Sequence, residues 1–377
     1  MPPRRKRQSV DHSVDNPATN DSRKRARLDL RTTAVVAVKS EVDIALPSLP
    51  TESKPDLNET GIASLQSRKL KVHESFSTTS PFPDWPKPTP EEALEVYDLL
   101  SKAHHHGSTP LQLESRVDRR APSVSQSTGE TKNSAETCGN VLNVLDALIG
   151  VVLSQATSGK GSAAAKHNLD QTFSPGSKNG LNEKGLKALA EAPKSEVVEA
   201  IRLGGLANKK ADVIQSLLKE VKRRYGRYSL QHLAGEDVDG INQQAPITDD
   251  EIMKELISYP GIGPKTASCV LLFCLARPSF AVDTHVFRLS KMLGWVPRSV
   301  KADRVKAQMH LDLKIPDHLK YGLHVLFIRH GRVCRGCKKA QENPGDESNE
   351  AECILRGYLQ TKARAKGNAE ATKVKQE

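Results

Sequence analysis

The chain has 377 residues, with 56 Lys and Arg against 45 Asp and Glu, and its formal charge is +11. No apolar run reaches the roughly 18 residues that a membrane-spanning helix needs. Six cysteines in a chain of this length do not make a disulfide scaffold. We therefore expect a soluble intracellular protein without a membrane partner, whose basic surplus suits a polyanion such as nucleic acid.

Residues 1–85 hold few aromatic residues and many Ser, Thr, Pro, Asp and Lys, so we expect a disordered basic tail. Basic clusters stand at 4–7 and 23–27 of this tail. Such clusters are typical of nuclear import signals, of nucleic-acid arms, or of a solvated run of charge. Because their spacing resembles a bipartite import signal, we favour import and a nuclear location. No apolar segment follows the basic start, so a secretory signal is not expected.

Residues 86–137 are expected to hold an N-terminal helix followed by a flexible insertion. Pro90 with two acidic residues behind it suits the first turn of a helix, which would run to about His106. The histidines at 104–106 are consecutive and do not share one helix face, so we expect no metal site there. Residues 107–137 are polar and rich in Ser, Thr and Arg, as in a flexible loop.

The folded region is expected between residues 138 and 360, with a basic, fraying tail at 361–377. We find helical apolar stripes and no strand pattern, so the sequence predicts an all-α fold. A capping box formed by Thr248 and Glu251 marks one helix start, and Asn208 is a candidate cap for another. The predicted helices cover 141–153, 197–203, 211–221, 252–257, 266–276, 286–293 and 321–328.

A short turn between two predicted helices is the most informative segment. Gly261 and Gly263 flank the apolar Ile262, and Pro264 opens the second helix. Glycines allow a tight backbone and a close approach to a partner, and the N–H groups at a helix start can bind a phosphate oxygen. The turn therefore predicts a contact with a nucleic-acid backbone.

Lys265 lies in the first turn of that second helix. A free lysine has a pKa of about 10.4, whereas a nucleophilic amine must be neutral. The helix dipole and partial burial would both lower its pKa. A nucleophile, a phosphate contact and a solvated side chain all remain open from this segment alone.

Asp283 follows Lys265 by 18 residues and precedes another helical stripe. Its plainest interpretation is an N-cap. It could also be a carboxylate beside Lys265 that accepts a proton and stabilises positive charge developing on a sugar ring. The two interpretations are compatible, because a cap holds the carboxylate rigidly.

The hairpin turn, Lys265 and Asp283 together resemble the signature of the endonuclease III family of helix-hairpin-helix DNA glycosylases. In this resemblance Lys265 falls on the family's Schiff-base lysine and Asp283 on its catalytic aspartate. The similarity spans about residues 138–337. The segments that carry it are 153–157, 204–211, 256–286 and 324–332.

The resemblance implies two helical domains around a cleft. One would be a six-helix barrel over 138–281 that contains the hairpin, and the other would join residues 282–360 to the N-terminal helix. The family flips a damaged base out of the duplex. Gln155 would fill the vacated gap and Leu206 would wedge beside the opposite strand, although a helix-end glutamine and a core leucine are the alternatives. The expected DNA-binding residues are Gln155, Leu206, Asn208, Lys209, Lys210, Gly261, Ile262 and Gly263.

The cysteines depart from the family pattern, as do Ser158, Pro264 and the longer segment 222–247. The family often holds a [4Fe–4S] cluster on four cysteines after His-Gly-Arg, whereas here only Cys334, Cys337 and Cys353 follow. We therefore expect no cofactor and no metal. A zinc site that adds His330, or a rebuilt cluster, remains the alternative.

The resemblance implies a monomeric, bifunctional DNA glycosylase and AP lyase of base excision repair, acting on double-stranded DNA with a damaged base. A 5-methylcytosine glycosylase of the plant type is a close alternative. A helix-hairpin-helix protein that binds DNA without catalysis is a third. The presence of both Lys265 and Asp283 favours an enzyme, because a pure binding protein needs neither.

Overall fold

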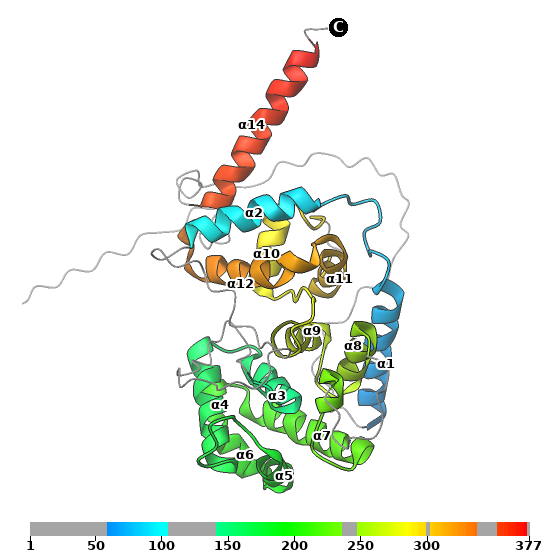
Figure 1. The fold of residues 1–377 in the computed structure, drawn as a ribbon, viewed down its shortest axis with the longest axis vertical. Coiled ribbons are helices and arrows are strands. Elements are labelled where there is room, and N and C mark those ends of the chain that lie inside the picture. Colours follow the sequence, from blue (N-terminus) through cyan, green and yellow to red (C-terminus); the bar gives the residue numbers. More distant parts are fainter. Residues whose placement is uncertain (1–58, 105–140, 236–246, 299–301, 338–352, 375–377) are drawn as a thin grey trace, which may run out of the picture. The chain divides into compact units, whose positions relative to one another are not determined.

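The computed structural model describes residues 59–104, 141–235, 247–298, 302–337 and 353–374. Over these ranges all regular structure is helical and there is no strand, which confirms the predicted all-α class (Figure 1). None of the described helices is long and apolar enough to cross a membrane. The insertion predicted at 107–137, both basic clusters and residues 236–246 of the longer segment 222–247 lie outside the described residues.

Thirteen α-helices and three shorter helical turns are assigned within these ranges. The α-helices are α1 (Glu59–Phe76), α2 (Pro90–Ala103), α3 (Val144–Ser154), α4 (Gly159–Phe173), α5 (Glu183–Glu191), α6 (Lys194–Ala200), α7 (Ala207–Tyr225), α8 (Asp249–Ser258), α9 (Pro264–Cys269), α10 (Thr284–Met292), α11 (Arg304–Lys314), α12 (Asp317–Val333) and α14 (Ile354–Val374). The shorter turns are η1 (Arg202–Gly204), η2 (Gln231–Ala234) and the π-helical η3 (Val270–Cys274).

The first hydrophobic cluster is built around α3. This helix is apolar on nearly every side and is buried from Val144 to Leu153, as its sequence predicts. Asn143 caps it by accepting a hydrogen bond from the backbone N–H of Asp146 at 3.1 Å. The other members of the cluster come from α4 to η3, with Ala281, Tyr321 and Val325 in addition.

The second hydrophobic cluster joins α2 to α10, α11 and α12, and also includes Leu355 of α14. Thr89 and Glu92 form a capping box at the start of α2. The helix then packs along α12, where a Cβ on Gly322 would come within 2.4 Å of the Tyr97 ring. Only glycine allows this approach. The division of the folded region near residue 281 stays a prediction, and the membership of the two clusters favours it.

Regular structure begins at a lower residue number than predicted. Residues 59–76 form α1, which lies beside α8 (Figure 1). The side-chain amide of Gln66 donates to the carbonyl oxygen of Ser258 at 2.5 Å. The expectation of disorder up to residue 85 is therefore wrong from residue 59 onward. The sequence of α1 has weak apolar periodicity and no capping signal. Its helical structure therefore depends on packing against α8 and not on its own pattern.

Two further boundaries differ from the prediction. The stretch 266–276 is not one α-helix, because α9 passes into the π-helical turn η3 and Ala276 has a φ of 53°. The tail predicted to fray from residue 361 instead continues α14 to Val374. That segment is rich in Ala and Lys, which are good helix formers.

Candidate active site and DNA interface

The hairpin lies between α8 and α9, and glycine is required at position 261 for two reasons. Gly261 has a φ of 75°, in the left-handed region. A Cβ at this position would also come within 2.5 Å of the Val213 side chain on α7. Ile262 is fully buried, so it anchors the turn, while Pro264 takes the first position of α9.

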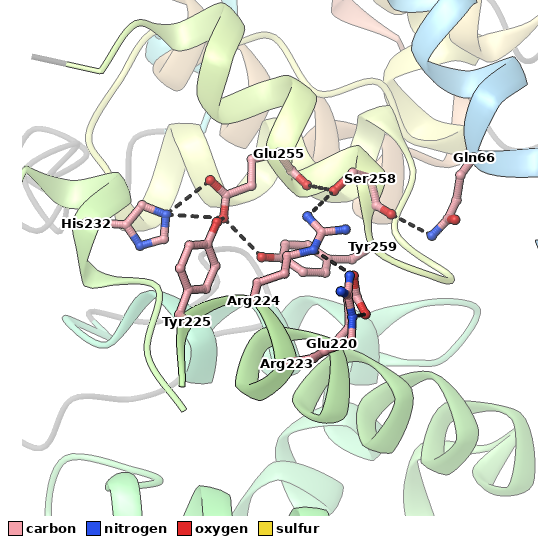
Figure 2. A network of polar contacts seen from close by, with 9 residues as sticks. All are labelled: Gln66, Glu220, Arg223, Arg224, Tyr225, His232, Glu255, Ser258 and Tyr259. Carbon is pink, nitrogen blue, oxygen red and sulfur yellow. Dashed lines mark hydrogen bonds and ion pairs between the residues drawn. The ribbon is translucent and has the colours of Figure 1, made fainter. Parts of the chain in front are cut away.

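A polar network holds the end of α8 where the hairpin begins (Figure 2). The Glu255 carboxylate accepts hydrogen bonds from the Tyr225 hydroxyl at 2.7 Å and from the Tyr259 hydroxyl at 3.0 Å, and it pairs with His232 at 3.0 Å. Burial opposes the charge, yet these partners keep the pKa of Glu255 below its usual value. Because Tyr259 is fully buried and directly precedes Pro260, the network fixes the entry to the hairpin.

The helix α1 also reaches the hairpin. The ammonium of Lys69 donates to the carbonyl oxygen of Ile262 at 2.7 Å. Burial lowers the pKa of Lys69. Lys69 lies in a segment expected to be disordered, and nothing in the hairpin motif indicates a contact with it.

Lys265 is half-buried in the first turn of α9. Asp283 is the N-cap of α10, and its carboxylate accepts a hydrogen bond from the backbone N–H of Val286 at 2.8 Å. The capping interpretation of Asp283 is thus confirmed. Its catalytic role and that of Lys265 stay predictions.

His324 of α12 is the residue that relates Lys265 to Asp283, and the sequence analysis did not single it out. Burial lowers the pKa of His324; electrostatic interactions with Cys269 and Asp283 oppose this, and the positive charge of Lys265 adds to it. Both candidate catalytic charges therefore act on one buried imidazole. Its Nδ1 lies 2.8 Å from the carbonyl oxygen of Ala281, an acceptor, so Nδ1 carries the hydrogen and donates. His324 thereby holds the backbone two residues before Asp283.

Gln155 lies close to the same helix as Lys265. Its side-chain amide donates to the Thr266 hydroxyl at 3.1 Å. The next residue, Ala156, has a φ of 48°, which is uncommon for a residue other than glycine. The Gln155 loop therefore joins the α9 segment through a tight, strained backbone.

Leu206 is not a core residue. Its side chain is 55% exposed, and its backbone has a φ of 51° at the start of α7. The left-handed conformation costs a non-glycine residue roughly 1–2 kcal/mol. An exposed leucine on a strained turn therefore fits the wedge interpretation and excludes the core interpretation. The same geometry makes Leu206 itself the N-cap of α7, so the predicted cap at Asn208 is wrong.

Lys210 does not belong among the DNA-binding residues. It is buried, and its ammonium donates to the carbonyl oxygens of Leu153 at 2.7 Å and Gly204 at 2.8 Å. Burial lowers its pKa. The expected DNA contact is therefore wrong, because the charge satisfies two helix-end carbonyls. Asn208 and Lys209 are exposed on the first turn of α7, as a DNA contact would need.

Four potential metal ligands meet at the end of α12. They are His330, Cys334, Cys337 and Cys353, and their ligand atoms all lie within 4.8 Å of one another. Three of the residues are buried and Cys334 is half-buried. This arrangement is compatible with a metal site, which the sequence analysis held as an alternative to the expected absence of any cofactor.

A sequence model of the HhH-GPD superfamily of base excision DNA repair proteins matches residues 149–312. The Arabidopsis thaliana protein named "Putative DNA glycosylase At3g47830" is 36% identical over 282 residues, which cover 74% of this chain and 88% of that protein. Endonuclease III of Sulfolobus acidocaldarius is 26% identical, over 60% of this chain and 85% of its own. A solved non-covalent endonuclease III–DNA complex is 21% identical, covers 68% of this chain and 100% of its own, and has a TM-score of 0.43. This chain belongs to the HhH-GPD superfamily of base excision DNA repair proteins.

Proposed function

We propose that this protein is a bifunctional DNA glycosylase and AP lyase that removes a damaged or modified base from double-stranded DNA. One observation carries the proposal: the buried His324 donates to the carbonyl oxygen of Ala281, which holds the backbone just before the N-cap Asp283, and its imidazole also senses the charge of Lys265. Membership of a base excision repair superfamily supports the reaction class. The lyase step and the roles of these residues are the parts that we add.

In the proposed reaction, the neutral amine of Lys265 attacks C1′ of the flipped nucleotide. The C1′–N bond breaks and the base leaves with the bonding electron pair, taking up a proton. The Asp283 carboxylate stabilises the positive charge that develops on the sugar. The amine gives up one proton, the C1′–O4′ bond then breaks, and O4′ takes up a proton as a protonated Schiff base forms. Loss of a C2′ proton from this Schiff base then breaks the C3′–O bond by β-elimination, and the 3′ phosphate leaves.

DNA engagement would use the two strained turns and the hairpin. Backbone N–H groups around Gly261 and Gly263 would bind a phosphate, as helix N-termini do. Gln155 would enter the gap left by the flipped base, and the exposed Leu206 would wedge beside the opposite strand. Asn208 and Lys209, exposed on the first turn of α7, would contact the DNA backbone.

A DNA-binding protein without catalysis is the competing function. It would need the hairpin but neither Lys265 nor Asp283. We also propose that the protein acts as a monomer in the nucleus, with import through the clusters at 4–7 and 23–27. Deletion of residues 1–30 should then abolish nuclear accumulation while leaving cleavage of a short duplex intact.

The test of the reaction class is a panel of duplexes that carry oxidised pyrimidines, oxidised guanine, 5-methylcytosine or an abasic site. Base release and strand cleavage are measured separately with the full chain. Release from at least one duplex, together with cleavage at the abasic site, is expected. Tight binding without release or cleavage on any duplex would favour the competing function.

A further inference from the structure

The end of α12 brings four metal-binding side chains into one small volume. His330 and Cys334 are four residues apart on the same helical face, and the backbone N–H of Cys334 still bonds to the carbonyl oxygen of His330 at 2.9 Å. Cys337 follows after two residues. Cys353 comes directly before α14 and completes the set from a distant part of the chain.

The ligand atoms are spaced as around a single ion. The Sγ atoms of Cys337 and Cys353 lie 3.3 Å apart, and they lie 3.4 Å and 3.7 Å from Nε2 of His330. A tetrahedral zinc with Zn–S near 2.3 Å and Zn–N near 2.05 Å has edges of about 3.8 Å between sulfurs and about 3.6 Å between sulfur and nitrogen. The two sulfur–nitrogen separations match this edge length, whereas the sulfur–sulfur separation is shorter by about 0.5 Å, so these ligand atoms lie close enough to share one ion.

The same residues do not fit the family's iron–sulfur cluster. Such a cluster uses four cysteine thiolates, each on a different iron, with the irons and sulfides occupying the space between them. Only three cysteines follow the His-Gly-Arg segment. Sulfur atoms 3.3 Å apart leave no room for a cube of irons and sulfides between them. Nor are these sulfurs bonded, since a disulfide needs about 2.05 Å.

The imidazole of His330 is also oriented as a ligand. Its Nδ1 lies 2.9 Å from Nε2 of His104, at the end of α2. A metal-bound histidine almost always donates its second ring N–H to a fixed acceptor, which sets the ring orientation. His104 supplies that acceptor, so Nε2 of His330 is left to face the thiolates.

We propose that His330, Cys334, Cys337 and Cys353 bind one structural zinc ion. All four positions are taken by protein, so the ion would have no open site for catalysis. It would tie α14 to the end of α12 and to α2, which donates His104. The proposal is independent of the proposed glycosylase reaction.

The site would stabilise a packed region that leads toward Asp283. Gly331, next to His330, lies so close to α10 that a Cβ would come within 2.8 Å of His285. Its carbonyl oxygen accepts a hydrogen bond from Arg288 at 3.0 Å. Loss of the ion should therefore loosen the support of α10 as well as the attachment of α14.

The test is metal analysis of the full chain, purified without added chelator. One zinc per chain and no stoichiometric iron are expected, with no broad visible absorbance. Cys337→Ser and Cys353→Ser should lose the zinc, whereas the matched control Cys274→Ser, at a buried cysteine elsewhere, should keep it. His104→Ala should retain the ligands but weaken zinc binding roughly 10- to 100-fold in competition with a chelator.

A second measurement uses wild-type protein, so it does not depend on whether the cysteine variants fold. Chelator-stripped wild-type protein is titrated with Co²⁺, which should give the visible bands of a tetrahedral, thiolate-bound ion at one equivalent. Stoichiometric iron with cluster absorbance would overturn the proposal. So would a metal-free chain whose thermal unfolding a chelator does not change and which shows no Co²⁺ spectrum.

Discussion

The ammonium of Lys210 donates to the carbonyl oxygen of Leu153, two residues before Gln155. The same ammonium donates to Gly204, two residues before Leu206. One buried lysine thus joins the two turns that we propose enter the DNA. The resemblance over 204–211 thus locates Lys210 next to a proposed DNA-binding turn, although its ammonium points into the protein.

Lys210→Met should destabilise the fold, because two helix-end carbonyls lose their donor in a buried place. The expected loss is about 1–3 kcal/mol in the free energy of unfolding, measured by urea denaturation. Unchanged stability would show that water replaces the ammonium without cost.

Lys209→Met is the matched control for that variant, since Lys209 is exposed beside it. It should leave the free energy of unfolding nearly unchanged. If Lys209 contacts a phosphate, the slope of log affinity against log salt should become shallower by about 0.9. An unchanged salt slope would remove Lys209 from the proposed interface.

Leu206→Gly separates stability from function. Glycine tolerates the left-handed backbone, so the substitution should not lower the free energy of unfolding. The wedge is lost, and affinity for a duplex with a damaged base should fall at least about tenfold, or 1.4 kcal/mol. Leu203→Ala, at a neighbouring exposed leucine, should change neither quantity. Equal losses in both variants would contradict a specific wedge.

Removal of α1 should destabilise the hairpin. A chain that begins at residue 77 loses the Gln66 and Lys69 contacts, so it should unfold at a lower temperature than one that begins at residue 59. Two lost hydrogen bonds of about 1 kcal/mol each predict a fall in Tm of at least about 4 °C. Equal Tm values for the two truncated chains would contradict a stabilising role of α1.

The sequence predicted the helices with strong periodicity and the turns with glycine, because those depend on local rules. The buried stripe of α3, the capping box at Thr248 and the positive φ of Gly261 follow directly from residue type and spacing. α1 escaped the prediction because its stability comes from contacts with α8, which its own pattern does not encode.

In the candidate site, too, residues within a local motif could be predicted and residues brought in by tertiary packing could not. Lys265 and Asp283 were found from a motif, whereas His324 was missed because a histidine in an apolar helix carries no signal of what surrounds it. The burial of Lys210 was likewise invisible in a run of polar residues. The ligand set at His330 depends on Cys353, whose distance along the chain gave no regular spacing.

Asp283→Asn tests whether the carboxylate does more than cap α10. Asparagine keeps the shape and an accepting oxygen, so the free energy of unfolding should change by about 1 kcal/mol or less. Base release should slow by roughly 10²- to 10⁴-fold if the charge serves the reaction. Single-turnover rates measure this, and wild-type rates in a stable variant would leave Asp283 as a cap alone.

The most direct test of the central claim is covalent trapping by borohydride on a duplex with an abasic site. Borohydride reduces the imine of a Schiff base to a stable amine, so wild-type protein should appear cross-linked to DNA on a denaturing gel. Lys265→Gln should lose both trapping and strand cleavage yet still bind the duplex through the hairpin. Lys254→Gln, at a partly exposed lysine of α8 that pairs with Asp250, should be trapped like wild type. Cleavage by wild-type protein without trapping, with Lys265→Gln equally active, would contradict Lys265 as the nucleophile.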